Sequence, residues 1–214
     1  FDAATATILV AGRNGVSNPA GVKRDFKTDA QYLVLATKQG KIKKTALSDY
    51  ASVRSTGIIA LNLELGDELA ASRLSHGNGD VFVATRRGQA IRFSEKDVRP
   101  MGRATAGVAA IRLAKGDEVV GMDVIHADSP ASLLIVTSKG MGKRTHLKEF
   151  PRQGRAGGGV RAITVIEKGG PIRVARVVNV DDDLVVISTN GQVITMLADA
   201  IPHKGRHAQG GAVM

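Results

Sequence analysis

The fold is decided by a stretch that reads Tyr32-Leu33-Val34-Leu35-Ala36-Thr37-Lys38-Gln39-Gly40-Lys41-Ile42-Lys43-Lys44-Thr45. An apolar run of β-forming residues enters a Thr-x-x-Gly turn, and a basic run leaves it. Strand-forming residues on both sides of a short turn, with a glycine that can adopt a positive φ angle, are typical of a β-hairpin. The stretch therefore predicts two antiparallel strands.

The hairpin pattern returns three more times, in copies that start at Asp80, Leu133 and Leu184. The turn glycines of the four copies are separated by 48, 52 and 51 residues, and they are Gly40, Gly88, Gly140 and Gly191. A period near fifty is too long for one coil of a solenoid and suits a four-stranded blade of a propeller-like protein.

A second element lies between the hairpins and has nearly the same period. Its copies are Gly57–Leu69, Gly107–Val119 and a looser one that begins at Gly159. Each copy reads as a strand, a Gly-centred turn and a second strand, so one unit supplies four strands. Stacked units bury the faces that a single sheet leaves open.

We therefore predict an all-β chain, 1–214, that forms one domain of about four blades with approximate ranges 1–56, 57–106, 107–158 and 159–210. Residues 1–31 match the repeat poorly, apart from a strand expected at Thr5–Ala11 and a turn at 12–15. The chain starts at Phe1, and its last residues, 210–214, resemble the opening of another unit. We expect a piece of a longer polypeptide.

Composition limits the class of protein. The 214 residues are 43% apolar but only 3% aromatic, with no Trp and no Cys, so the core must be aliphatic and disulfides and thiol catalysis are excluded. No apolar run approaches the ~20 residues of a membrane span, and we expect no membrane contact. The formal charge of +10 favours a polyanionic partner.

Motifs for catalysis or for metal binding are absent from the sequence. There is no Walker-type loop, no Gly-x-Ser-x-Gly and no His-Glu-x-x-His. His203 and His207 are four residues apart in a Gly-rich loop, where a solvated or phosphate-contacting role is favoured over a metal site. Asp181–Asp183 is favoured as a charged turn over a cation site. We predict no catalytic residue, no metal and no cofactor in this domain.

Positive charge recurs at the same place in successive units, in the hairpins and in the loops that follow them. Copies placed side by side would join these residues into a stripe suited to the phosphates of duplex DNA, without base reading. The alternative is that basic turns only keep sheet edges soluble, but that role predicts charge of both signs. The predicted DNA-binding residues are Lys38, Lys41, Lys43, Lys44, Arg54, Arg86, Arg87, Arg92, Arg99, Arg103, Lys139, Lys143, Arg144, Arg152, Arg155, Lys204 and Arg206.

The loop 152–159 is rich in both arginine and glycine. Glycines allow the backbone to approach a ligand closely and expose its N–H groups, while arginines supply charge. Such a loop is weak evidence alone, but the loops 99–103 and 203–211 make it a recurring feature.

The motifs taken together resemble the C-terminal domain of the DNA gyrase A protein. The resemblance covers about residues 31–214 and is carried by Gly57-Ile-Ile-Ala-Leu, Gly66-Asp-Glu-Leu, Ile91-Arg-Phe-Ser-Glu-Lys-Asp-Val-Arg-Pro-Met-Gly-Arg, Gly116-Asp-Glu-Val-Val-Gly-Met and Lys143-Arg-Thr. It implies a β-pinwheel, a propeller-like disc that wraps double-stranded DNA around a basic rim and so supports ATP-dependent negative supercoiling.

The resemblance also implies that the domain is not an enzyme by itself. ATP and Mg would act elsewhere in the parent isomerase, an A2B2 assembly of gyrase A and gyrase B proteins in the bacterial cytoplasm or nucleoid, and the isolated domain would be a monomer. The A protein of topoisomerase IV has a related domain and stays open as an alternative. A propeller-type scaffold that binds an acidic protein is the alternative from a different class.

Two features depart from the gyrase pattern. The family carries a box of the form Gln-Arg-Arg-Gly-Gly-Lys-Gly in its first blade, and the nearest match is a degenerate one, with Ala156 and Gly158 in place of expected residues; it comprises Gln153, Gly154, Arg155, Ala156, Gly157, Gly158 and Gly159. We expect a true box upstream or none. The fourth hairpin, 188–196, has no Lys or Arg, so that segment should contact DNA weakly.

Overall fold

The computed structural model describes residues 8–11, 30–51, 57–126, 129–165, 167 and 169–213. The chain is all-β, as predicted, with short 3₁₀ turns η1 (Leu47–Tyr50), η2 (Glu95–Asp97), η3 (Leu147–Glu149) and η4 (Ala198–Ala200). No helix in the described residues is both long and apolar enough to cross a membrane. The turn and loop expected at 12–29 lie outside the described residues.

The strands form four antiparallel sheets, which we call blades 1 to 4. Blade 1 has the order β4 (Leu69–Ser75), β2 (Tyr32–Thr37), β3 (Lys41–Ala46), β7 (Val108–Ala109). Blade 2 has the order β8 (Val119–Ile125), β5 (Asp80–Thr85), β6 (Gln89–Ser94), β11 (Val160–Arg161). Blade 3 has the order β12 (Ile172–Val178), β9 (Ser132–Thr137), β10 (Met141–His146), β15 (Gly211–Ala212). Blade 4 has three described strands in the order β1 (Ile8–Ala11), β13 (Asp183–Ile187), β14 (Val193–Leu197).

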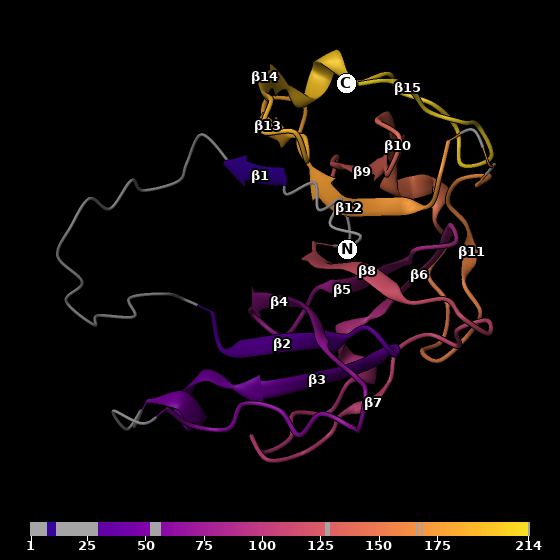
Figure 1. The fold of residues 1–214 in the computed structure, drawn as a ribbon. Helices are drawn as coiled ribbons and strands as arrows, with labels where there is room; N and C mark the ends of the chain where they lie inside the picture. Colours follow the sequence, from indigo (N-terminus) through magenta and orange to yellow (C-terminus); the bar gives the residue numbers. More distant parts are fainter. Residues whose placement is uncertain are drawn as a thin grey trace, which may run out of the picture.

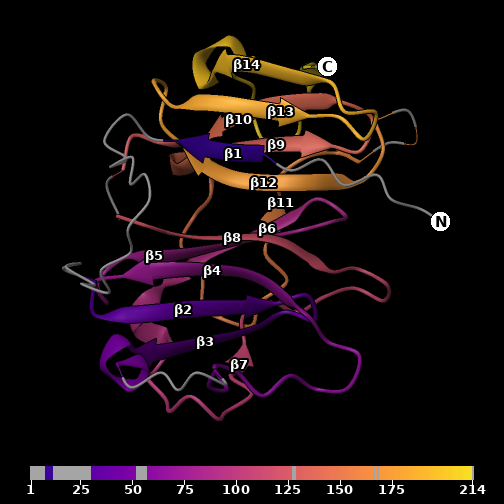
Figure 2. The same cartoon turned by 60° about the vertical axis from the view of Figure 1, so that its left-hand side comes forward.

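The blades stack on one another in chain order, from blade 1 at the bottom of Figure 1 to blade 4 at the top. A second view shows the strands of each sheet lying roughly parallel to those of the next (Figure 2). Strands β4, β8 and β12 adjoin one another along one edge of the stack, which we call the inner edge. Strands β7, β11 and β15 end the sheets on the opposite side, the outer edge.

All four predicted hairpins are confirmed, with β2–β3, β5–β6, β9–β10 and β13–β14 paired in register. In the first turn, Thr37 Oγ1 accepts a hydrogen bond from the Lys41 N–H (3.2 Å), and Gly40 has φ +82°. The motif Gly66-Asp67-Glu68, which we call the Gly-Asp-Glu motif, supports the same turn, because Asp67 Oδ1 accepts a hydrogen bond from the Gln39 N–H (2.9 Å). The motif therefore stabilises the hairpin turn.

The sheets divide the chain at points other than the predicted ranges. Blades 1 to 3 each take their outermost strand from beyond the next hairpin, so β7 completes blade 1 although it follows β6 in sequence. A Cβ atom on Gly107 would lie 2.5 Å from the Ile42 carbonyl oxygen, so only glycine allows this approach. The result is that consecutive blades are interlocked.

One part of the predicted repeat is wrong. The strands expected after the leading glycines are two residues long at β7 and β11, and no strand forms over 57–65. After β7 the chain leaves the ladder, because the N–H groups of Ala110 and Ile111 both donate to the Gly40 carbonyl. The segment then packs on the hairpin turn.

Apolar side chains fill the space between neighbouring blades. One cluster joins blades 1 and 2, a second joins blades 2 and 3, and a third joins blades 3 and 4. The clusters are largely aliphatic, as the composition predicts, with one edge-to-face ring contact between Phe82 and Phe150 at 5.0 Å. Blade-to-blade burial therefore supplies the hydrophobic core.

A carboxylate links three blades at the inner edge. Asp123 on β8 is 7% exposed and pairs with Arg73 on β4, while Arg176 Nε on β12 lies 3.5 Å from Asp123 Oδ2. The Val177 N–H donates to the same oxygen (2.8 Å). Burial, the largest influence, lowers the pKa of Arg176. The inner edge is thus fixed by polar contacts as well as by packing.

Candidate nucleic-acid interface

The basic residues predicted to bind DNA divide into a buried group and an exposed group. Four are almost wholly inside the protein, with exposed fractions of 1% for Lys43, 4% for Lys44, 0% for Lys143 and 5% for Arg144. They lie on β3 and β10, at the third and fourth positions after the turn glycine. A buried cation needs compensating partners, so the partners indicate what each side chain does. Arg54 lies outside the described residues.

The lysine at the third position ties its hairpin to a glycine-rich loop. Lys143 Nζ donates to the carbonyls of Gly205 and Arg206, both at 2.8 Å. Lys43 Nζ donates to the carbonyls of Ala60 (2.7 Å) and Arg103. Burial lowers the pKa of Lys143 to about 8, and burial likewise lowers the pKa of Lys43. Both ammonium groups are used inside the fold.

The basic residue at the fourth position anchors a loop as well. Lys44 Nζ donates to the Glu95 carbonyl (3.1 Å) and lies 3.6 Å from Glu95 Oε1. Arg144 donates from Nε to the Ile201 carbonyl (2.9 Å) and from Nη2 to Asp199 Oδ1 (2.8 Å). The buried Glu95 and the exposed Asp199 are both on 3₁₀ turns, η2 and η4.

In blade 2 the fourth position is Arg92, whose Nε lies 2.7 Å from Asp80 Oδ2. Arg152 occupies the other oxygen of the fully buried Asp80 at 2.6 Å, while half of its own side chain stays exposed. Of the two arginines, only Arg152 therefore keeps much of its surface toward solvent.

These positions correct the sequence analysis. The side chains of Lys43, Lys44, Lys143 and Arg144 are enclosed, and they bond to carbonyl and carboxylate oxygens of the protein. The sequence predicts these four side chains at an exposed rim, but segments from later in the chain enclose them. The predicted stripe loses these four residues.

Three half-buried cations beside the hairpin turns have acidic partners. Lys38 Nζ lies 2.8 Å from Glu68 Oε2, and this hydrogen bond raises the pKa of Lys38. Arg86 Nη1 lies 3.1 Å from Glu118 Oε1, the equivalent glutamate of the second Gly-Asp-Glu motif. Lys41 pairs with Glu64. Such surface pairs contribute at most about 1 kcal/mol to stability, but they reduce the local positive potential.

The other predicted cations stay accessible. They are exposed or half-buried, and none forms an ion pair within the described part of the chain: Arg87, Arg99, Arg103, Lys139, Arg155, Lys204 and Arg206. Most belong to three loops with a shared Gly-Arg step, 99–107, 151–159 and 202–210, which we call the Gly-Arg loops. They cover the hairpins of blades 1, 2 and 3 in turn, through parallel bridges such as Arg92 to Arg152.

The Gly-Arg loops meet the loops of neighbouring blades. The Arg112 N–H donates to the Gly157 carbonyl (2.9 Å), and Thr164 Oγ1 donates to the His207 carbonyl (3.1 Å). These loops adjoin β7, β11 and β15 at the outer edge, which runs in Figure 1 from β7 at the bottom past β11 on the right to β15 near the top. The accessible cations of the Gly-Arg loops therefore lie along the outer edge of successive blades.

The degenerate box lies within the second Gly-Arg loop. Its Gln153 N–H donates to the Arg92 carbonyl (2.7 Å), and its Ala156 N–H donates to the Ala110 carbonyl (2.8 Å). Ala156 has φ +66°, a left-handed conformation that disfavours residues with a Cβ atom. The backbone thus explains why glycine suits this position of the box.

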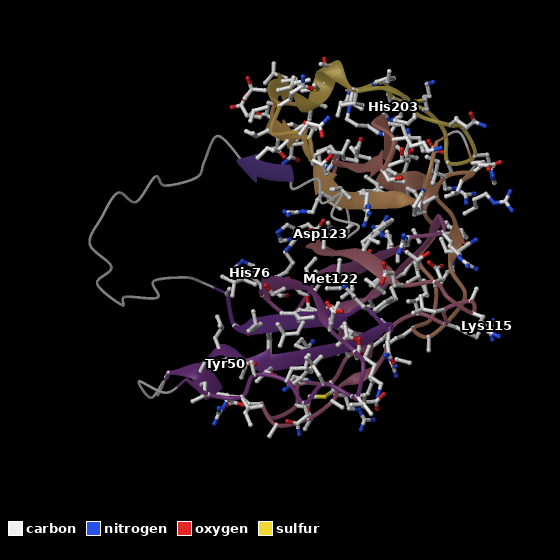
Figure 3. The ribbon with its side chains drawn as sticks, in the orientation of Figure 1. Tyr50, His76, Lys115, Met122, Asp123 and His203 are labelled. Atoms are coloured by element: carbon white, nitrogen blue, oxygen red, sulfur yellow. The ribbon has the colours of Figure 1, made fainter. Side chains whose placement is uncertain are left out.

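Two other features of the outer edge were not predicted. The His203 ring packs against the His146 ring at a tilt, with ring centroids 3.8 Å apart. Burial, followed by the neighbouring His146 and Arg144, lowers the pKa of His203. Lys115 lies at the outer edge of the molecule, beside the turn of blade 2 (Figure 3), where its carbonyl accepts from Arg87 Nη1 (2.9 Å). The sequence signal for Lys115 was its place before the Gly-Asp-Glu motif.

Small antiparallel sheets stacked around an inner edge, with a row of cationic loops along the outer edge, define a propeller-like domain with a basic rim. The family described as DNA gyrase C-terminal domain, beta-propeller, matches residues 31–74, 79–126, 131–179 and 182–210. The chain belongs to this family, and the resemblance inferred from its motifs is confirmed.

Related sequences and solved structures point to the same family. The DNA gyrase A protein of Staphylococcus epidermidis is 40% identical over 191 residues, which are 89% of this chain and 21% of that protein. The chain thus spans about a fifth of the length of the curated relatives it matches. A topoisomerase IV C-terminal domain superposes with a TM-score of 0.82 at 26% identity over 89% of this chain and 59% of that one. A DNA gyrase A C-terminal domain superposes with a TM-score of 0.79 at 28% identity, over 87% of this chain and 62% of that one.

Proposed function

We propose that this domain binds double-stranded DNA along its outer edge and bends it around the stacked blades. The observation that carries the proposal is the row of Gly-Arg loops, whose cations Arg99, Arg103, Arg155, Lys204 and Arg206 form no ion pairs within the described residues. Phosphate contacts need no base reading, which suits a surface made by repetition. Family membership supports the same function.

The energetics favour many small contacts. Bending 20–30 bp of duplex costs about 1–6 kcal/mol, and each phosphate that a cation neutralises releases counterions. The backbone N–H groups of the glycine-rich loops add donors for the same phosphates. Blade 4 would contribute little, because β14 exposes Val193, Ile194 and Leu197 instead of cations.

The proposal places the domain in an ATP-dependent type IIA topoisomerase, in which wrapped DNA would support negative supercoiling. The remainder of the gyrase A protein and the gyrase B protein would be its partners, in the bacterial cytoplasm or nucleoid. ATP and Mg would act outside this domain, which would carry no catalytic residue and no cofactor.

The test is the ligation of nicked circular DNA with and without the 214-residue chain. A domain that wraps DNA shifts the linking-number distribution of the closed circles, whereas a domain that binds an acidic protein leaves it unchanged. Binding without a shift would reject wrapping but keep DNA binding. Neither binding nor a shift would favour the acidic-protein alternative.

Charge reversal at accessible rim residues locates the surface. The triple variant Arg87→Glu, Arg99→Glu, Lys139→Glu should bind a duplex at least tenfold more weakly, and its log–log salt slope should fall by about 3. The matched control keeps the charge, with Arg87→Lys, Arg99→Lys and Lys139→Arg, and should bind within about twofold of the wild type. Equal affinity of both triple variants would contradict the rim site.

A further inference from the structure

The arginine that follows the glycine of each Gly-Arg step makes the same contact with a neighbouring segment. Arg103 Nη1 donates to the Ile59 carbonyl (3.2 Å), and Arg206 Nη1 donates to the Arg161 carbonyl (3.2 Å). Arg155 Nη1 donates to the Ala109 carbonyl. Each acceptor lies two residues after a leading glycine, Gly57, Gly107 or Gly159. The contact is therefore part of the repeat, present three times.

Two of these contacts join blades. Ala109 is in β7 at the outer edge of blade 1, whereas the loop that carries Arg155 is bonded to β6 of blade 2 through the Arg92 carbonyl. In the same way, Arg206 lies over blade 3, and Arg161 is in β11 of blade 2. The inner edge is held separately by Asp123. A contact at the outer edge therefore bears on the angle between two blades.

The guanidinium groups retain unused donors. Arginine has five N–H groups in a planar fork. Arg103 and Arg206 each use Nη1, and Arg155 uses Nε toward Asp97 (3.3 Å) and Nη1 toward Ala109. Within the described residues, Nη2 of all three makes no hydrogen bond, and the side chains are half-buried.

We propose that Arg155 and Arg206 are positioning residues that couple DNA contact to the angle between neighbouring blades. One side of each guanidinium holds the adjacent segment, and the other meets a phosphate, so the same group sets the curvature of the rim and binds the DNA that follows it. This inference rests on the proposed function.

Substitution of these arginines by lysine separates phosphate binding from the contact between blades. Its ammonium keeps the positive charge but lacks the planar fork that reaches two partners at once. The double variant Arg155→Lys, Arg206→Lys should therefore keep its affinity for a duplex of about 15 bp within twofold, because a duplex that short is recognised mainly by charge. It should lose about half or more of the linking-number shift produced on saturated circles, because the blade angle is no longer fixed.

The matched control is Arg112→Lys with Arg161→Lys. Both arginines are exposed and make no side-chain hydrogen bond within the described residues. This control should match the wild type in short-duplex affinity and in linking-number shift. Melting temperature is measured for every variant, and the single variant Arg206→Lys replaces the double one if the latter folds poorly.

The outcomes are distinct. A double variant that melts earlier but shifts the linking number as the wild type does would reduce the arginines to structural contacts and overturn the inference. More than about tenfold weaker binding of the short duplex would also overturn it, because the arginines would then act as direct contacts alone. If the wild type itself binds no DNA or gives no shift, the proposed function fails first.

Discussion

The hairpins of blades 1 and 3 differ from the hairpin of blade 2 at one interior position. Three residues after the turn glycine, blades 1 and 3 have Lys43 and Lys143, whereas blade 2 has Ile91, and all three side chains are at most 1% exposed. The lysines hydrogen-bond to carbonyls of a Gly-Arg loop. Ile91 instead joins the apolar cluster between blades 1 and 2. One place in the repeat is thus filled in two chemically opposite ways.

The residue two positions further on changes in parallel. Thr45 and Thr145 accompany the lysines, and Phe93 accompanies the isoleucine; all three are buried completely. A polar pair and an apolar pair can both fill the space under the loop. The comparison teaches that a lysine in a repeated basic run can be a structural residue, and that its neighbours reveal which kind it is.

Reversing the buried charge should have the largest effect. Lys143→Glu would place a carboxylate against the Gly205 and Arg206 carbonyls, so we expect a loss of at least about 4 kcal/mol in the free energy of unfolding. Lys139→Glu, in the exposed turn of the same hairpin, should change it by less than about 0.5 kcal/mol. Urea denaturation followed by circular dichroism measures both. Similar stability of the two variants would show that Lys143 is not enclosed.

The pH dependence of stability should separate the two hairpin types next. Below pH 8, Lys143 is protonated in both the folded and the unfolded protein, and the cost of burying its charge is present in full. Between pH 8 and its ordinary pKa of 10.5, the folded protein releases this proton first, so the unfolded chain binds more protons and stability rises with pH.

The measurement is the difference in unfolding free energy between the wild type and Lys143→Met, taken from pH 7 to pH 10.5. Groups shared by the two proteins cancel, so the difference should move in favour of the wild type above pH 8. Ile91→Met in blade 2 serves as the control and should give a difference that is flat with pH. A difference that falls with pH would contradict the lowered pKa of Lys143.

The sequence was sufficient to predict the strands that carry its strongest patterns. The hairpins, their turn glycines and the approximate period follow from local chemistry, so they were placed correctly around Gly40, Gly88 and Gly140. The exchange of outer strands was not predictable in this way. It depends on which distant segment covers a hairpin, and β7 and β11 are only two residues long.

The same distance limits the prediction of the site. Alternation along β3 says that Lys43 and Ile42 point to opposite faces, but it cannot say that a loop near Arg103 closes over the lysine. Residues in loops, such as Arg99 and Lys204, were easier to place, because loops on a propeller rim are exposed by default. Burial by a non-local loop separates the predicted residues that are enclosed from those that stay accessible.

The threonines beside the two lysines offer the finest test of the comparison. Thr145 Oγ1 donates to the Lys204 carbonyl at 2.8 Å, whereas Thr45 Oγ1 is buried with no hydrogen-bond partner among the described residues. Thr145→Val should therefore lower the free energy of unfolding by about 1 kcal/mol, because it removes this hydrogen bond and leaves the Lys204 carbonyl without that donor. Thr45→Val should be neutral or slightly stabilising, because it replaces an unsatisfied hydroxyl by a methyl group of the same shape. Equal losses of unfolding free energy in the two variants would contradict this prediction. They would mean that Thr45 and Thr145 contribute equally to stability.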